Sequence, residues 1–158
     1  MKKDDAKVWN PNEGDCLQGD VILFKVPSDL VIDRSMEIEP RQNGQLVLAE
    51  GEITGHHHAI WLREPVMFRD DALARDVATV APPVAASAKM WKDDKAVQEL
   101  VNRGELTIPR LAIGFLEVTG DFMTLRHDEH QAIKIPPGLY YVGNQREFDA
   151  AEERRVRD

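Results

Sequence analysis

The chain is poor in cysteine and has no long apolar run. It holds one cysteine, Cys16, in 158 residues, which excludes an internal disulfide framework and a CxxC zinc knuckle. No apolar run approaches the roughly 20 residues that span a bilayer, and the start, Met-Lys-Lys-Asp-Asp-Ala-Lys, lacks the apolar core of a signal peptide. No glycine-rich phosphate loop follows a predicted strand. We therefore expect neither a membrane partner nor a nucleotide cofactor. The cytoplasm is the default expectation for the compartment, and no signal in the sequence indicates it.

Basic residues are in deficit. The 20 Lys and Arg are outnumbered by 28 Asp and Glu, which gives a formal net charge of −8 and a pI of about 5.1. This balance argues against electrostatic binding of nucleic acid over the whole surface of the chain. The hydrophobic fraction of 42% and the charged fraction of 30% are typical of a globular protein. The length suits one domain.

Short apolar runs separated by turn signals predict a mainly β domain over residues 19–149. Asn43-Gly44 is a strong hairpin signal. Tyr140 and Tyr141 alternate between faces, so one is expected in the core and the other at the surface. The pattern favours a small antiparallel barrel or sandwich, with a jelly-roll-like arrangement possible. The candidate strands are 21–26, 36–38, 45–50, 56–62, 66–68, 111–118, 122–125, 132–135 and 139–142.

Three segments differ from this pattern. Residues 1–18 are polar and are expected to form a loosely attached N-terminal arm. Residues 69–110 are interpreted as an insertion, with an extended alanine-rich loop over 70–91 and a helix over 93–103. Asp93 or Asp94 can cap that helix, and Gly104 can end it. Residues 150–158 form a charged tail, either a solvated helix or a partner-dependent segment.

All five histidines fall in two short segments, His56–His58 and His127–His130. On a strand, His56 and His58 share a face with Ile60 and so point to the interior. Buried neutral imidazoles need partners for their nitrogens, and imidazole is the commonest metal ligand. If the two segments meet in space, they predict a site for a divalent Zn, Fe, Mn or Ni ion. The candidate ligands are His56, His58, His127, Glu129 and His130.

This site leaves two functions open. The first is a metal- or ligand-binding β protein, in which an open coordination position could activate water with Glu129 as ligand or base. Whether such a protein is an enzyme is not decided by the sequence. The second is a non-enzymatic homo-oligomer or partner-binding module in which the histidines are structural. Cys16 as a nucleophile has no local signature to support it.

Two segments also resemble a known pattern. Leu48–His58 matches LAEGExTGHxH, and His127–Phe148 is similar to HxEHxxIxxPxGxYxVxxQREY. The pattern resembles that of an uncharacterised family of small bacterial proteins, and the likeness covers residues 19–26, 46–58 and 125–149. The resemblance implies that the five candidate ligands belong to the family signature, and it supplies no activity.

A looser likeness is to the cupins, whose first motif contains H-x-H, as in His56-His57-His58. The histidine of the second cupin motif is replaced here by Tyr141. A cupin-type centre would therefore have to recruit His127 or His130 as its remaining ligand.

Overall fold

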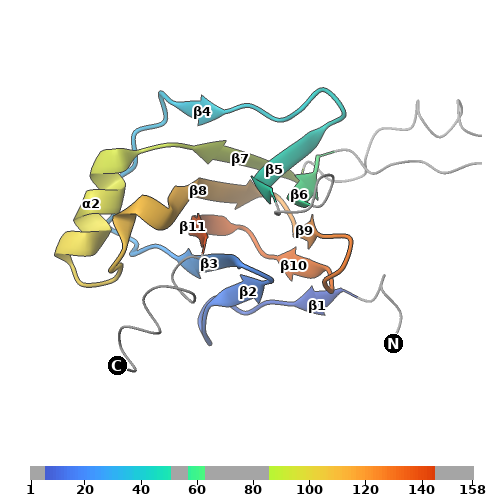
Figure 1. Cartoon of the computed structure of the whole chain (residues 1–158), viewed down its shortest axis with the longest axis horizontal. Coiled ribbons are helices and arrows are strands. Elements are labelled where there is room, and N and C mark those ends of the chain that lie inside the picture. Colours follow the sequence, from blue (N-terminus) through green and yellow to red (C-terminus); the bar gives the residue numbers. More distant parts are fainter. Residues whose placement is uncertain (1–5, 51–56, 63–85, 145–158) are drawn as a thin grey trace, which may run out of the picture.

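The protein is a two-layer β-sandwich with a helix on one outer face (Figure 1). This computed structural model describes residues 6–50, 57–62 and 86–144. Within them, two sheets pack face to face and neither closes into a barrel, so the observed architecture is the sandwich. All strand pairs are antiparallel except β1 with β10.

The five-stranded sheet has the order β1-β10-β9-β6-β5, and the six-stranded sheet has the order β2-β3-β11-β8-β7-β4. In the first sheet the bounds are β1 (Lys7–Val8), β10 (Ile133–Ile135), β9 (Met123–Arg126), β6 (His57–Trp61) and β5 (Gln45–Glu50). In the second they are β2 (Cys16–Gln18), β3 (Val21–Lys25), β11 (Gly138–Asn144), β8 (Ala112–Thr119), β7 (Ser87–Trp91) and β4 (Glu37–Ile38).

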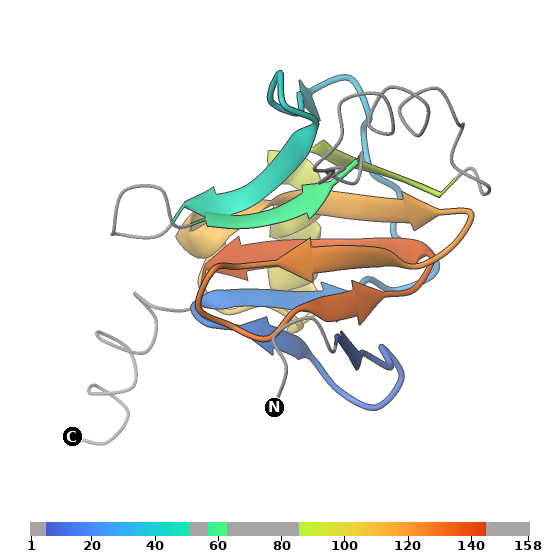
Figure 2. The ribbon, with the colours of Figure 1, turned by 90° about the vertical axis from the view of Figure 1, so that its right-hand side faces the viewer.

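The helix α2 (Asp94–Asn102) covers the outer face of the six-stranded sheet and lies behind the strands in Figure 2. Asp93 is its N-cap and accepts a hydrogen bond from the Ala96 N–H at 3.1 Å. Gly104, with a φ of +79°, follows its C-terminal end. The helix presents buried Val97 and Leu100 to the sheet. A short 3₁₀ turn, η1 (Pro109–Leu111), then leads into β8.

The strand β11 is consequently buried on both faces. Tyr140 belongs to the core between the two sheets, and Tyr141 belongs to the second core, beneath α2. The expectation that one of these tyrosines is exposed is wrong, because α2 covers the face that would otherwise meet water. Burial raises the pKa of each phenol to about 12.

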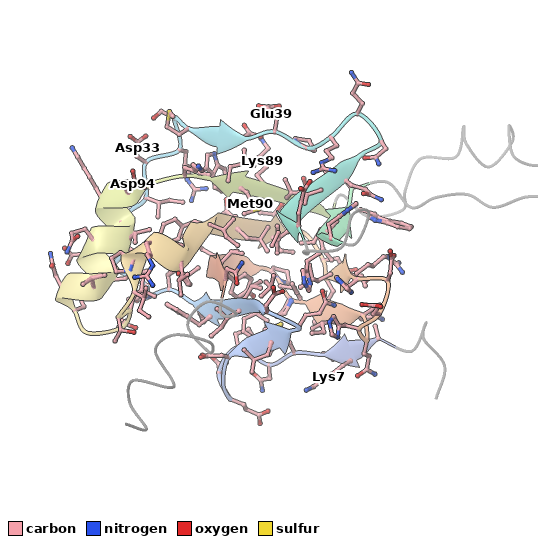
Figure 3. All side chains as sticks on the ribbon, viewed as in Figure 1. Lys7, Asp33, Glu39, Lys89, Met90 and Asp94 are labelled. Carbon is pink, nitrogen blue, oxygen red and sulfur yellow. The ribbon has the colours of Figure 1, made fainter. Side chains whose placement is uncertain are left out.

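Two predictions about irregular segments are also wrong. The alanine-rich loop was expected to extend to Trp91, but β7 begins at Ser87 and pairs with β8 and β4. In this strand Met90 is fully buried and Lys89 is exposed, the alternation that a strand requires (both are labelled in Figure 3). The N-terminal arm is not loosely attached over residues 7–18, since β1 and β2 join the sheets and Trp9, Cys16 and Gln18 are buried.

Several expectations lie outside the described residues. These are the strand at 66–68, most of the alanine-rich segment and the charged tail at 150–158. The interpretation of 69–110 as an insertion stays a prediction. In the portions of the chain that the structure describes, no helix has the length and apolar character to cross a bilayer.

Candidate functional site

His58 lies in the interior, on the face of β6 that the strand alternation predicted. Its side chain is 1% exposed, and the neighbouring inward residue Ile60 is fully buried. The β5–β6 pairing shifts register between Val47 and Ala49, and Ala49 is the partner of His58. A buried imidazole in this position must satisfy both ring nitrogens within the protein.

Gln18, at the end of β2, fixes the tautomer of His58. Its amide nitrogen donates to the backbone carbonyls of Leu125 at 3.0 Å and Gln131 at 2.9 Å. Because a carbonyl can only accept, these two bonds orient the amide, and Gln18 Oε1 is left to face His58 Nδ1 at 2.8 Å. Nδ1 therefore carries the hydrogen, and the lone pair of neutral His58 is on Nε2.

That lone pair faces a carboxylate. Asp20 Oδ1 is 3.3 Å from His58 Nε2, and the Asp20 side chain is only 16% exposed. Burial lowers the pKa of His58 to about 4, with further lowering from His127 and His130 and an opposing effect from Asp20. The lone pair of neutral His58 and the Asp20 carboxyl group thus lie close enough to bind one cation together.

The second histidine segment meets the first. His127 and His130 lie in the β9–β10 loop, and the centroid of the His127 ring is 4.3 Å from that of His58 and 4.6 Å from that of His130. The His58 and His130 centroids are 6.1 Å apart. His127 Nδ1 accepts a hydrogen bond from the Glu129 N–H at 3.1 Å, so the hydrogen of neutral His127 is on Nε2.

Gly19 lies against the cluster at the turn between β2 and β3. Its φ is +58°, a left-handed conformation that favours glycine. A Cβ at this position would lie 2.7 Å from His130 Nε2 and 3.2 Å from His58 Cε1. Glycine at this position thus allows the two imidazoles to pack directly against the backbone that leads into Asp20.

The histidines are gathered but not arranged as a closed coordination sphere. Over residues 6–50, 57–62 and 86–144, no three His, Cys, Asp or Glu side chains are placed to hold a metal ion. The planes of His58 and His130 are within 9° of parallel, so these rings stack. Metal coordination would require rotation of the rings in the β9–β10 loop.

The other predicted residues have different positions. Glu129 is exposed and contacts the cluster through its backbone N–H. His57 points to the opposite face of β6, and its Nε2 is 2.9 Å from Gln45 Oε1. His56 lies outside the described residues. Cys16 is buried, which raises the pKa of its thiol to about 12 and makes it a poor nucleophile.

Sequence reasoning missed Gln18, Gly19 and Asp20. The only local signal was the Gly-Asp turn before a buried strand, which indicates a hairpin and no chemistry. Gln18 was assigned to a polar arm, although it is 2% exposed. Its partners are distant in the chain, 40 positions away for His58 and 113 for Gln131.

The fold and the cluster together define a small β-sandwich protein with a histidine-rich site where three loops or strand ends meet. The family model described as "Domain of unknown function (DUF8820)" matches residues 17–145, and the chain belongs to this family. The match confirms membership of an uncharacterised family and includes every residue of the cluster. No curated protein and no solved structure matches the chain.

Proposed function

We propose that this protein binds one divalent transition-metal ion at the histidine cluster, with His58 Nε2, Asp20 and His130 as the primary ligands. The observation that carries the proposal is the lone pair of buried His58 facing the Asp20 carboxylate at 3.3 Å in a partly buried contact. Two ligands about 2.1 Å from a tetrahedral ion lie about 3.4 Å apart. A metal ion between the two groups would be bound by a nitrogen lone pair and a carboxylate oxygen at once.

The surroundings of His58 favour a ligand role. A metal-binding histidine usually donates its other ring N–H to a fixed acceptor, and Gln18 Oε1 is such an acceptor. Gly19 lets the His130 and His58 rings approach the backbone next to Asp20, where a Cβ would clash with His130. His127 is the proposed fourth ligand. Its recruitment would require the proton to move to Nδ1 and the bond from the Glu129 N–H to break.

A donor set of imidazoles and a carboxylate suits Zn, Fe, Mn or Ni. When bound, such an ion would lower the pKa of a coordinated water and polarise an oxygen-containing substrate. Glu129, two residues from His127, is the proposed proton acceptor from that water. This reaction class is metal-assisted chemistry.

Equilibrium dialysis of the tag-free protein against Zn²⁺, followed by metal analysis, tests the proposal. Co²⁺ serves as a spectroscopic probe of the coordination number. We expect close to one equivalent of tightly bound metal in the wild type. Asp20→Asn removes one ligand charge without creating a cavity, and we expect it to weaken binding at least tenfold. His58→Gln should do the same.

His57→Gln is the matched control, because His57 is the adjacent imidazole but points away from the cluster. It should bind metal as the wild type does. Wild-type protein without bound metal would overturn the proposal. So would equal losses in Asp20→Asn and His57→Gln, since these would indicate adventitious binding to the histidine run.

The assembly alternative is favoured by a different observation. The edge strands β1 and β2 lie on the same side of the sandwich (Figure 2), and each carries an exposed apolar residue, Val8 at 61% and Leu17 at 53%. Exposed strand edges with apolar side chains are potential sites of strand pairing between chains. Three results together would favour this alternative: the protein is a dimer by light scattering, it holds no bound metal, and Leu17→Lys dissociates the dimer.

A further inference from the structure

A pocket of about 470 Å³ adjoins the histidine cluster on the outer face of the five-stranded sheet. His127 and His130 line it, and so do His57, Trp61 and Arg126. The volume is within the usual range for a small-molecule site. Because two histidines of the cluster also form the pocket wall, a molecule bound in the pocket would lie beside the proposed metal ion.

Arg126 is the cationic side chain of this pocket. It lies on β9, paired with Ala59 of β6, and is half-buried. Its Cζ is 5.1 Å from the centre of the Trp61 ring. Stacking on an aromatic ring stabilises a guanidinium and fixes its plane. A fixed guanidinium presents paired N–H donors whose spacing matches the two oxygens of a carboxylate.

The other lining groups favour an anion of small size. Asp128 is the carboxylate among the described lining residues, and it is exposed, whereas Arg126 is half-buried. Asn43, Gln45 and His57 contribute neutral polar groups, and Ala59 and Ala132 leave room. A metal ion at the cluster would add positive charge next to the part of the pocket that His127 and His130 line.

We propose that this pocket binds a small organic carboxylate, with Arg126 anchoring the carboxylate and the rest of the molecule directed toward His127 and His130. The inference deepens the proposed function and rests on it for the metal side of the pocket. Arg126 is a binding residue in this scheme.

Calorimetric titration of the zinc-loaded protein with malonate tests the inference, with malonamide as the neutral analogue. We expect malonate to bind and malonamide not to bind. Arg126→Gln should weaken malonate binding at least tenfold while zinc content is unchanged. Arg126→Lys keeps the charge and loses the paired donors, so it should be intermediate. Arg110→Gln, an exposed arginine on η1 outside the pocket lining, should bind malonate like the wild type.

The failures of the two proposals can be distinguished. Zinc binding with no malonate binding, or with malonate binding that Arg126→Gln leaves unchanged, overturns this inference alone. Inorganic phosphate binding more tightly than malonate overturns the assignment to carboxylates. If the wild type takes no zinc, the proposed function fails. The anchor role of Arg126 then stands only if the metal-free protein binds malonate in an Arg126-dependent way, and otherwise falls too. Melting curves of each variant identify any loss of folding.

Discussion

Replacing Gln18 with leucine should destabilise the protein and weaken metal binding together. The side chain of Gln18 makes three hydrogen bonds, to the His58 ring and to the carbonyls of Leu125 and Gln131. Leucine has a similar volume and can form none of them. The substitution therefore leaves a ring N–H and two carbonyls without these partners in a largely buried region.

The size of the destabilisation follows from the three groups that lose a hydrogen bond, which are the His58 ring N–H and the two backbone carbonyls. Each buried polar group left unsatisfied costs about 1–3 kcal/mol, and burial of the leucine side chain offsets about 1.5–3 kcal/mol of that total. We expect a net loss of about 3 kcal/mol in the free energy of unfolding. For a chain of this length that corresponds to about 10 °C in Tm. Loss of the bond that orients a ligating histidine lowers metal affinity by about 10–100-fold.

Urea unfolding in EDTA measures the stability term, and zinc titration calorimetry measures the affinity term. Gln98→Leu is the matched control, since Gln98 is exposed on α2 and bonds only to Asn102 among the described contacts. It should change stability by less than about 0.5 kcal/mol. If Gln18→Leu is as stable as that control in EDTA, the reasoning about the buried network is wrong. If stability falls but zinc affinity does not, Gln18 is structural and does not orient a ligand.

Three further predictions concern the same region. The free energy of unfolding of the metal-free protein should fall by about 3 kcal/mol as the pH falls from 6.5 to 4, because the folded pKa of His58, about 4, is below the ordinary 6.5. This contribution of His58 is complete above pH 6.5. Urea titrations of His58→Gln at a series of pH values should lack this slope. Gly19→Ala should lower both Tm and zinc affinity. Gly104→Ala, also at positive φ but with open space around its Cβ, should lower Tm alone. Equal zinc affinities of these two variants would contradict the proposed contact of Gly19 with the cluster. Cys16 should react with iodoacetamide only through opened forms of the protein, so its labelling rate should rise with urea. Labelling that is independent of urea would refute its burial.

The strands that the sequence predicted well are those with a clear local signal. The inward direction of His58 followed from alternation along β6, and Asp93 was one of two predicted caps for α2. The strand β7 was missed because its small residues Ser87 and Ala88 continue an alanine-rich stretch, and only pairing with β8 and β4 makes it a strand.

The site was predicted in part for the same reason. Clustering of the histidines along the chain suggested that they act together, and the structure brings three rings into contact. Nothing local marked Gln18 or Asp20, because their roles depend on tertiary contacts with His58. The position of Glu129 could not be predicted either, since a loop between two strands does not follow the strand alternation.

The place of β11 between β3 and β8 has a consequence for biosynthesis. Strands at residues 21–25 and 112–119 become neighbours of a common partner only when residues 138–144 have been translated. Both hydrophobic clusters include a tyrosine from this late segment, so a nascent chain cannot close either one earlier. A truncated product ending before Gly138 would expose two unpaired strand edges, the feature that leads to aggregation and to removal by quality control.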